Sequence, residues 1–401
     1  MSEVLLKDIT ELIVDCPHST AYDEGKGFPL VRTPNIGKGR LIYSGMHLVS
    51  EEVYNQRNAR AVPQEDDLIF AREATAGNVA LIQKDEKVCL GQRTVLIRPD
   101  KSKVNPAYLT YTLLAPKQQY NLLSTANGAT VAHVNLPTIR NLKLDIPNIE
   151  TQHRIASILS RYDSLIENYQ KQIKLLEEAA QRLYKEWFVD LHFPGHENTK
   201  IVDGVPEGWE KKKISEVCDT IGGGTPSTKV LSYYENGTIS WVTPTDITKN
   251  NSLCLLSSEK KITKEGLDHS SAKMLPAETI LMTSRASVGF FGICDFEVCT
   301  NQGFISCVPF DNNFQMYLLY NLMNRVEEIR IKAGGSTYLE ISKSVFRNFD
   351  IICPKDDLIC LFQKEAHQLL ERMRMICKQI RLLTEARDRL LPKLMSGEIT
   401  V

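Results

Sequence analysis

The sequence of 401 residues lacks the features that would mark a membrane protein, a secreted protein or a compact nucleic-acid-binding domain. No apolar run reaches the roughly 18 residues that span a bilayer, and the N-terminus is acidic too early for a secretory signal. The 48 Lys and Arg residues are balanced by 49 Asp and Glu residues, so there is no basic excess. We therefore expect a folded cytoplasmic protein with no membrane partner, in which any contact with nucleic acid depends on local basic groups.

A metal centre is not predicted either. The ten cysteines include no CxxC pair, and His192 and His196, although spaced like ligands, are accompanied by no second ligand pair. Cysteines without such a pattern in a cytoplasmic chain are best interpreted as reduced, mostly buried thiols.

Catalytic and cofactor-binding signatures are also missing. The chain contains no phosphate loop GxxxxGK[ST], no GxGxxG fingerprint, no GxSxG elbow and no Asn-Pro-Pro-aromatic tetrapeptide of the adenine methyltransferase type. The glycine run at 221–227 could form an amide nest for a phosphate, but no Lys-Ser or Lys-Thr follows it. A turn is therefore the favoured interpretation, and we expect a chain that is not an enzyme and binds no cofactor itself.

The most informative feature that is present is an internal repeat. Residues 127–147 match residues 334–354 in a shared Gly-rich start, an Arg-Asn pair and a closing Pro; 334 and 127 differ by 207, as do 354 and 147. Further upstream, 88–99 matches 298–309, and Pro63 through Arg72 matches Pro276 through Arg285. Small changes in the offset are what loop insertions produce, so the chain is a duplication of one unit.

Each copy is expected to consist of a globular part followed by a long helix. Short β-branched stretches bounded by Gly, Pro and Asn, such as 68–71, 94–98 and 239–243, are typical of strands, and 108–114 and 316–323 are typical of short helices. The predicted fold class is α+β, with two homologous globular domains separated by a long antiparallel two-helix coiled coil. The expected parts are domains at 1–147 and 209–350, long helices at 148–190 and 351–401, and a linker at 191–208.

The two long helices carry the coiled-coil pattern, because their apolar residues alternate in spacings of four and three. Arg387 interrupts the second seam, Pro392 is expected to end or kink that helix, and Thr151 is a candidate N-cap of the first helix. A generic helical hairpin remains the alternative. The predicted seam consists of Ile155, Leu159, Tyr162, Ile166, Tyr169, Ile173, Leu176, Ala180, Leu183 and Trp187, with Phe362, Ala366, Leu369, Met373, Ile376, Ile380, Leu383, Leu390 and Leu394.

The loops of both copies contain side chains of the types that read base edges or hold phosphates. The pairs Arg72/Arg285 and Gln92/Gln302 recur at matching places and are the strongest candidates. A scaffold role shared by both copies stays open for them, as ordinary surface polarity does for the rest. The candidate DNA contacts are Arg32, Asn35, Lys38, Arg40, Arg72, Thr75, Asn78, Gln92, Arg93, Asn127, Thr130 and His133 in the first copy, and Thr225, Thr243, Thr245, Asp246, Arg285, Ser287, Asn301, Gln302, Ser336, Thr337 and Tyr338 in the second.

Several longer motifs resemble those of a known family. They are Pro206-Glu-Gly-Trp209 at the start of the second copy, Ile239 through Asp246, Thr151 through Ala156, and Arg389 through Ile399 with its Leu-Met-Ser-Gly-Glu-Ile ending. Over essentially its full length the chain resembles the specificity subunits of type I restriction-modification systems. One departure is that the first copy has Asp15 through Thr20 where the second has its Gly-Gly-Gly-Thr-Pro-Ser run, so the two domains need not recognise similar sequences.

The resemblance implies a function and a set of partners. Each globular domain would be a target recognition domain that reads one half of a bipartite site in double-stranded DNA, and the coiled coil would fix the gap between the halves. The subunit would do no chemistry but would recruit two methyltransferase subunits that use S-adenosylmethionine, and also restriction or translocase subunits that use ATP and Mg. The outward helix faces are candidates for the methyltransferase interface, with a solvated coiled-coil face as the alternative, through Arg154, Arg161, Lys171, Lys174, Arg182 and Lys185. A two-headed protein-binding scaffold without DNA sequence readout is the alternative function.

Overall fold

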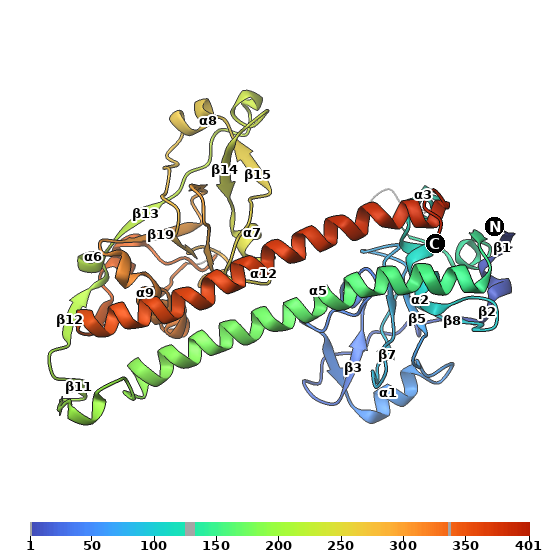
Figure 1. The fold of residues 1–401 in the computed structure, drawn as a ribbon, viewed down its shortest axis with the longest axis horizontal. Coiled ribbons are helices and arrows are strands. Elements are labelled where there is room, and N and C mark those ends of the chain that lie inside the picture. Colours follow the sequence, from blue (N-terminus) through green and yellow to red (C-terminus); the bar gives the residue numbers. More distant parts are fainter. Residues whose placement is uncertain (1, 125–132, 336–337) are drawn as a thin grey trace. The chain divides into compact units, whose positions relative to one another are not determined.

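The computed structural model describes residues 2–124, 133–335 and 338–401, which form two compact units (Figure 1). Unit 1 comprises Met1–Ile166 and Leu383–Val401, and unit 2 comprises Glu167–Leu382. Helix α5, Ile149–Tyr184, begins in unit 1 and ends in unit 2, whereas helix α12, Asp356–Ser396, begins in unit 2 and ends in unit 1. Each unit therefore contains the globular part of one copy and a stretch of both long helices.

The globular part of unit 1 is built on two sheets. A four-stranded antiparallel sheet has the order β2-β8-β5-β6, and a three-stranded sheet has the order β4-β3-β7 with β3 and β7 parallel. The strands are β1 Ser2–Leu5, β2 Thr10–Asp15, β3 Phe28–Val31, β4 His47–Val49, β5 Leu68–Ala71, β6 Val79–Leu81, β7 Cys89–Leu90, β8 Thr94–Pro99 and β9 Lys143–Ile146, which pairs with β1. The shorter helices are α1 Glu51–Arg57, α2 Pro106–Leu114, α3 Pro116–Ser124 and α4 Leu136–Arg140, with 3-10 turns at Leu6–Ile9 and Thr33–Asn35.

Unit 2 repeats this arrangement. Its sheets have the orders β13-β19-β16-β17 and β15-β14-β18, again with one parallel pair, β14 and β18. The strands are β10 Ile201–Val202, β11 Val205–Pro206, β12 Glu210–Lys213, β13 Cys218–Gly222, β14 Ile239–Val242, β15 Lys260–Ile262, β16 Ile280–Thr283, β17 Phe291–Ile293, β18 Cys299–Thr300, β19 Phe304–Pro309 and β20 Asp350–Cys353. The helices are α6 Ile214–Val217, α7 Pro244–Thr248, α8 Lys264–Asp268, α9 Gln315–Asn324, α10 Val326–Lys332 and α11 Lys343–Arg347. The predicted α+β class and the duplication are confirmed.

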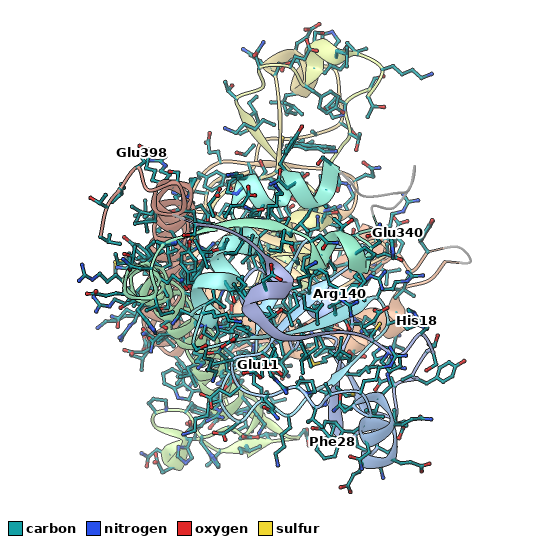
Figure 2. The ribbon with its side chains drawn as sticks, turned by 90° about the vertical axis from the view of Figure 1, so that its right-hand side faces the viewer. Glu11, His18, Phe28, Arg140, Glu340 and Glu398 are labelled. Atoms are coloured by element: carbon teal, nitrogen blue, oxygen red, sulfur yellow. The ribbon has the colours of Figure 1, made fainter. Side chains whose placement is uncertain are left out.

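An arginine contact shows how closely the two units correspond. Arg140, labelled in Figure 2, ends α4 and donates from Nη2 to the carbonyl of Ile13 in β2 over 3.1 Å. Arg347 ends α11 and donates from Nη2 to the carbonyl of Thr220 in β13 over 2.9 Å. Both donors and both acceptors lie 207 positions apart in the sequence, so the offset found in the sequence applies to individual hydrogen bonds.

One of the two central strands of the larger sheet in unit 1, β5, is buried on both faces. In β5, Leu68 and Phe70 belong to one apolar cluster with residues of α2, while Ile69 and Ala71 belong to a second cluster on the other side. Side chains alternate across a strand, and here both faces are covered. The continuous apolar run that predicted this strand is therefore explained by its central place in the sheet.

The long helices pack on each other in both units. In unit 1, Ile155 and Leu159 of α5 share an apolar cluster with Leu394 of α12. In unit 2, the ring of Phe362 lies 6.1 Å from that of Tyr184, the last residue of α5, and 5.9 Å from that of Trp187 in the π-helical segment Lys185–Val189 that follows, which brings the end of α5 beside the start of α12. The antiparallel coiled coil is confirmed, and all the predicted seam positions are buried or half-buried.

Three expectations about the helix ends and the seam are corrected. Asn148, not Thr151, caps α5, because its Oδ1 accepts from the backbone N–H of Thr151 over 2.9 Å. Pro392 does not end α12, which continues to Ser396; Leu394 is 2% exposed within the unit 1 core, so packing holds the last turn. Arg387 does not merely interrupt the seam, since it pairs with Asp163, a buried residue of α5.

Two further structural findings concern chemistry. Within the described ranges, no helix is long and apolar enough to cross a membrane, and no cluster of three or more His, Cys, Asp or Glu side chains is placed to bind a metal ion. Eight of the ten cysteines are buried; Cys360 is exposed and Cys377 is half-buried. Burial raises the pKa of Cys89 and Cys299 to about 12, so these two thiols stay protonated at neutral pH.

Candidate nucleic-acid interface

The turn after β3 and the matching turn after β14 contain candidates that hold the backbone in place. Asn35 is 1% exposed; its Oδ1 accepts from the backbone N–H of Arg32 over 3.2 Å, and its Nδ2 donates to the carbonyl of Ile42 over 3.1 Å. In unit 2, Oδ2 of Asp246 accepts from the backbone N–H and from the hydroxyl of Thr243 over 2.8 and 2.7 Å. These side chains cap equivalent turns, so their hydrogen bonds are already used within the protein.

The remaining candidates near these turns differ in exposure. Arg32 is half-buried and donates from Nη2 to the carbonyl of Gly45 over 2.7 Å, and Arg40 is half-buried and donates to the carbonyl of Gly39 over 3.2 Å. Lys38 and Thr245 are exposed. At these turns, Lys38 and Thr245 are therefore the candidates best placed to contact a ligand from outside.

Thr75 and Asn78 join the loop after β5 to the turn after β3. The hydroxyl of Thr75 donates to the carbonyl of Thr33 over 2.8 Å, and Nδ2 of Asn78 donates to the carbonyl of Ile36 over 2.9 Å. Ser287, in the corresponding loop of unit 2, is half-buried, and its backbone N–H donates to the carbonyl of Arg285 over 2.8 Å. Thr75 and Asn78 therefore connect neighbouring loops of unit 1, whereas the contact of Ser287 stays within its own loop.

Gln92 and Gln302 perform the same task in the two units. Nε2 of Gln92 donates to the carbonyl of His18 over 2.8 Å and to the hydroxyl of Thr20 over 3.0 Å. Oε1 of Gln302 accepts a hydrogen bond from the hydroxyl of Thr225. Each glutamine thus forms a hydrogen bond to the loop that follows the first strand of the larger sheet. Gln92 and Gln302 therefore occupy equivalent positions in the two units, as predicted.

The turn expected for the glycine run at 221–227 is not formed there, because the run begins in β13 and continues as irregular backbone packed against β18. The backbone N–H of Gly224 donates to the carbonyl of Thr300 over 2.9 Å, and a Cβ on Gly223 would lie 2.1 Å from the carbonyl oxygen of Asn301. The side chain of Asn301 accepts from the backbone N–H of Gly303 over 2.9 Å. Glycine is needed here because two backbone segments approach closely, which explains the run without a bound phosphate.

Arg72 is buried in a polar network of unit 1. Its Nη1 lies 2.8 and 2.9 Å from the two carboxylate oxygens of Asp15, its Nε donates to the carbonyl of Val134 over 3.0 Å, and its Nη2 lies 3.0 Å from Nε2 of His133. Nδ1 of His133 lies 2.7 Å from Oε1 of Glu73. Every guanidinium nitrogen of Arg72 therefore has a protein partner, and the residue braces the loop that contains His133.

The structure corrects the pairing of Arg72 with Arg285. The backbone N–H of Val134 donates to the carbonyl of Arg72, and that of Ile341 donates to the carbonyl of Ser284, each over 3.0 Å. Strand pairing agrees, since Ala71 faces Thr94 and Thr283 faces Phe304. Ser284 is therefore the structural counterpart of Arg72, and Arg285 is the counterpart of Glu73.

Arg285 lies in a different environment from Arg72. Its side chain is 47% exposed, and its Nε lies 3.6 Å from Oε2 of Glu340, which is labelled in Figure 2. Tyr338 of the same segment is 60% exposed. The candidates Asn127, Thr130, Ser336 and Thr337 lie outside the described residues.

The cationic residues proposed for the outward helix faces are exposed, as the seam register requires. Arg154, Arg161, Lys171, Lys174, Arg182 and Lys185 all lie on the exposed side of α5 or its continuation. Three of them have acidic partners: Arg154 lies 2.5 Å from Glu150, Lys174 lies 4.0 Å from Glu178, and Lys185 lies 2.5 Å from Asp190.

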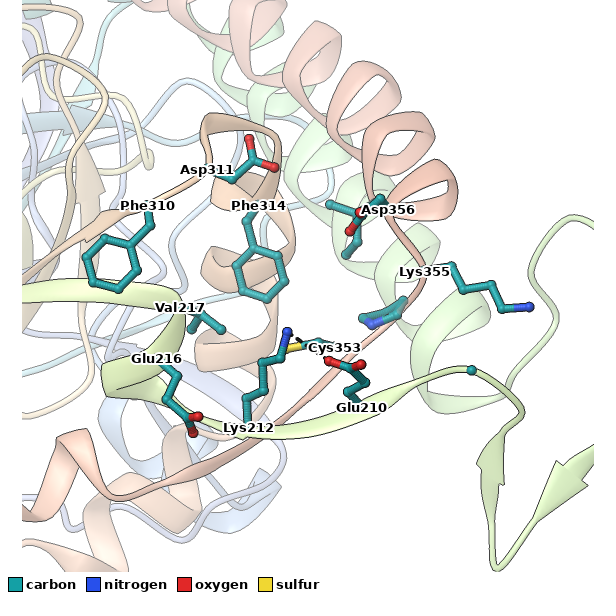
Figure 3. A pocket seen from close by; sticks show the side chains of 13 residues that line it. Glu210, Lys212, Glu216, Val217, Phe310, Asp311, Phe314, Cys353, Lys355 and Asp356 are labelled. Carbon is teal, nitrogen blue, oxygen red and sulfur yellow. Dashed lines mark ion pairs between the residues drawn. The ribbon is translucent and has the colours of Figure 1, made fainter.

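Figure 3 shows a pocket of about 520 Å³ in unit 2, and none of the residues that line it is a candidate DNA contact. Its charged lining consists of four carboxylates against two ammonium groups, and Lys212 and Glu210 form an ion pair of 2.9 Å within it. Phe310 adds an exposed ring. This lining has no positive excess for a phosphate backbone, so we place the candidate interface at the loops around the larger sheets.

Sequence reasoning missed the acidic members of these networks. Asp15, Glu73 and Glu340 pair with arginines, and their partners come from distant segments that sequence spacing does not bring together. A signal for Arg140 and Arg347 was present, because both lie in the aligned repeat at the constant offset.

Comparison with known proteins agrees with this geometry. The family model described as type I restriction modification DNA specificity domain matches residues 2–178 and 206–381. The MjaIX specificity subunit of a type I restriction enzyme from Methanocaldococcus jannaschii is 26% identical, over 99% of this chain and 93% of its own length. The HindI specificity subunit from Haemophilus influenzae is 23% identical, over 85% of this chain and 88% of its own.

A solved structure supports the fold as well. The crystal structure of the type I restriction-modification system S subunit from M. genitalium superposes with a TM-score of 0.58 at 15% identity, covering 98% of this chain and 95% of that one. The two matches of the family model cover most of the sequence, one for each copy of the repeat. The chain therefore belongs to the family of proteins built from the type I restriction modification DNA specificity domain.

Proposed function

We propose that the protein is the DNA sequence-specificity subunit of a type I restriction-modification complex, in which each unit reads one half of a bipartite site. The observation that carries the proposal is the double match of the DNA specificity domain, once to each copy of the repeat. The two units share strand order but differ in their loop side chains. A common scaffold with different loops is what reading two different half-sites requires.

The division of labour with partners is part of this proposal. Two methyltransferase subunits would supply S-adenosylmethionine and methylate adenine N6, which requires the target base to be flipped out of the duplex. Restriction or translocase subunits would bind ATP and Mg. This chain would supply sequence selectivity and no catalytic group, and the complex would act in the cytoplasm. Its near-zero net charge fits a subunit whose partners contribute much of the attraction to phosphate.

The coiled coil would set the gap between the half-sites. Helices α5 and α12 run through both units and are held by an apolar seam over their length. Such a helix pair is stiff, because each a or d side chain packs into the partner helix. The outward cationic face of α5 is the surface we propose for methyltransferase binding.

Exchange of the first domain is the experiment that tests this function. Replacing residues 1–147 with the corresponding domain of a relative that has a different specificity should change one half of the methylated sequence and leave the other half unchanged. The measurement is sequencing of methylated adenines after modification by the reconstituted complex. A chimera that still methylated the original full site, or a wild-type complex without sequence preference, would favour a protein-binding scaffold instead.

A further inference from the structure

The ends of β5 and β16 place one exposed arginine beside one carboxylate in each unit. In unit 1, Nε of Arg93 lies 2.9 Å from Oε2 of Glu73. In unit 2, Nε of Arg285 lies 3.6 Å from Oε2 of Glu340. The arginine side chains are 61% and 47% exposed, so both guanidinium groups face solvent while an acidic neighbour restrains them.

These four residues occupy equivalent corners of homologous sheets, but with the charges redistributed. Ala71 and Thr283 are equivalent residues at the ends of β5 and β16. Glu73 and Arg285 are each the second residue after these strands, so Glu73 corresponds to Arg285. Arg93 corresponds to Gly303, because the backbone N–H groups of Arg72 and Ser284 donate to their carbonyls over 2.9 and 2.8 Å. Each corner thus has one guanidinium and one carboxylate, supplied from different positions of the chain.

A third position of the repeat, His133 in unit 1 and Glu340 in unit 2, also differs in charge between the two corners. His133 and Glu340 are 207 positions apart in the repeat. In unit 1 the histidine binds Glu73 through Nδ1 over 2.7 Å, and in unit 2 the glutamate at this position is itself the partner of Arg285. The arrangement was therefore not preserved residue by residue, although both units place an exposed arginine beside a carboxylate.

The contact geometry leaves the same part of each guanidinium available. Both carboxylates approach Nε, and neither Arg93 nor Arg285 has a hydrogen-bond partner at Nη1 or Nη2 among the described residues. The two Nη groups of an arginine form the donor pair that binds O6 and N7 of guanine, or two phosphate oxygens, in a bidentate manner. Arg93 also holds a left-handed backbone with φ of 62°, a conformation that is unfavourable for a non-glycine residue and is often found at functional sites.

We infer that Arg93 and Arg285 are the equivalent specificity-determining arginines of the two units, each presenting its Nη pair to paired acceptor atoms of DNA, with Glu73 and Glu340 as their positioning residues. This inference rests on the proposed function and assigns its chemistry to particular side chains. It replaces Arg72/Arg285 with Arg93/Arg285 as the pair of corresponding contacts. Arg72 is excluded from direct contact because all its nitrogens are bound within unit 1.

The test uses the full chain in complex with its methyltransferase subunits and duplex DNA that contains its methylated site. Arg93→Ala and Arg285→Ala should each weaken binding about 5- to 150-fold, and each should affect one half-site only. A guanine contact would appear as a relaxed base preference at one position of the methylated sequence. A phosphate contact would leave the sequence unchanged and lower the slope of log K against log salt by about 1, and this result would overturn the specificity-determining role.

Lys211→Ala is the matched control in unit 2. Lys211 is an exposed cation in an ion pair with Asp350 at 2.8 Å, on a separate sheet. Lys143, paired with Glu3 at 2.9 Å, serves the same purpose in unit 1. If the arginine variants bound DNA and selected sites as these lysine variants do, the inference would be overturned. A wild-type complex that showed no site preference would instead refute the proposed function itself.

The positioning role has its own readout. Glu73→Gln and Glu340→Gln keep the arginine charge but remove its restraint, so the salt slope should stay unchanged while discrimination at the same half-site falls. Should an alanine variant fail to fold, Arg285→Lys and Arg93→Lys retain charge but cannot form the bidentate contact. A glutamine variant with a lowered melting temperature and full discrimination would show that the carboxylate acts on stability alone, and would overturn its positioning role.

Discussion

Replacing Arg387 with leucine is expected to lower the free energy of unfolding of unit 1 by about 3–5 kcal/mol. Nη1 of Arg387 donates to Oδ1 of Asp163 over 2.7 Å, and the hydroxyl of Tyr111 donates to Oδ2 over 2.5 Å. Asp163 is 6% exposed, so loss of its cationic partner leaves a carboxylate that water cannot solvate. Burial and the charge of Asp163 raise the pKa of Tyr111, which stays a neutral donor and cannot replace the cation.

Tryptophan fluorescence would not report the unfolding of unit 1, because all three tryptophans lie in unit 2. Hydrogen exchange of unit 1 peptides is therefore the measurement that should report this loss of stability. For a domain of the size of unit 1, the expected loss of free energy of unfolding corresponds to a fall of roughly 6–20 °C in the melting temperature of that unit. Arg389→Leu, at an exposed position of the same helix, should change the free energy by less than about 0.5 kcal/mol. Equal losses in the two variants would contradict the role given to Arg387.

A combined variant separates the lost pair from lost packing. Asp163→Leu, Arg387→Leu and Tyr111→Phe together should recover most of the stability, because apolar replacement of a whole buried ionic group is often neutral. The repeat contains this solution already: the counterparts of Asp163 and Arg387 in unit 2 are Leu370 and Ala180, both fully buried.

Replacing Arg72 with alanine is expected to lower the free energy of unfolding of unit 1 by about 2–3 kcal/mol. The change removes charged hydrogen bonds to Asp15 and the bond to the carbonyl of Val134. DNA binding by the molecules that remain folded should be nearly normal, since no nitrogen of Arg72 is available to a ligand. Arg93→Ala should behave in the opposite way, because an exposed ion pair contributes little to stability.

Thermal unfolding and DNA titration of both variants decide between these roles. The expected pattern is a lowered melting temperature with retained affinity for Arg72→Ala, and an unchanged melting temperature with weakened binding for Arg93→Ala. A stable Arg72→Ala protein with weakened binding would show that Arg72 contacts DNA, as the sequence alone allowed.

The parts of the fold that were predictable are those set by periodic patterns. The heptad seam predicted the antiparallel helix pair because its register depends only on the spacing of apolar residues along the chain. The apolar runs at 68–71 and 94–98 predicted strands because these are central in the sheet and buried on both faces. The constant offset of the repeat predicted that both copies have the same fold.

Side-chain roles in the loops were less predictable, because they depend on contacts between distant segments. Arg72 and Arg285 align in sequence, yet a one-residue difference in the loop before β5 and β16 places them at non-equivalent positions. Arg72 meets Asp15, whereas the strand position of Asp15 is occupied in unit 2 by Gly222. Asn35 and Asp246 are types that read bases or cap turns, and only the structure shows that they cap.

We propose that the two units of one chain read the two halves of a single DNA site. Sequencing of methylated adenines in DNA modified by the wild-type complex tests it most directly. We expect one bipartite sequence, with two specified halves and an unspecified gap of constant length between them. A continuous recognition sequence without such a gap, or methylation without sequence preference, would contradict the claim.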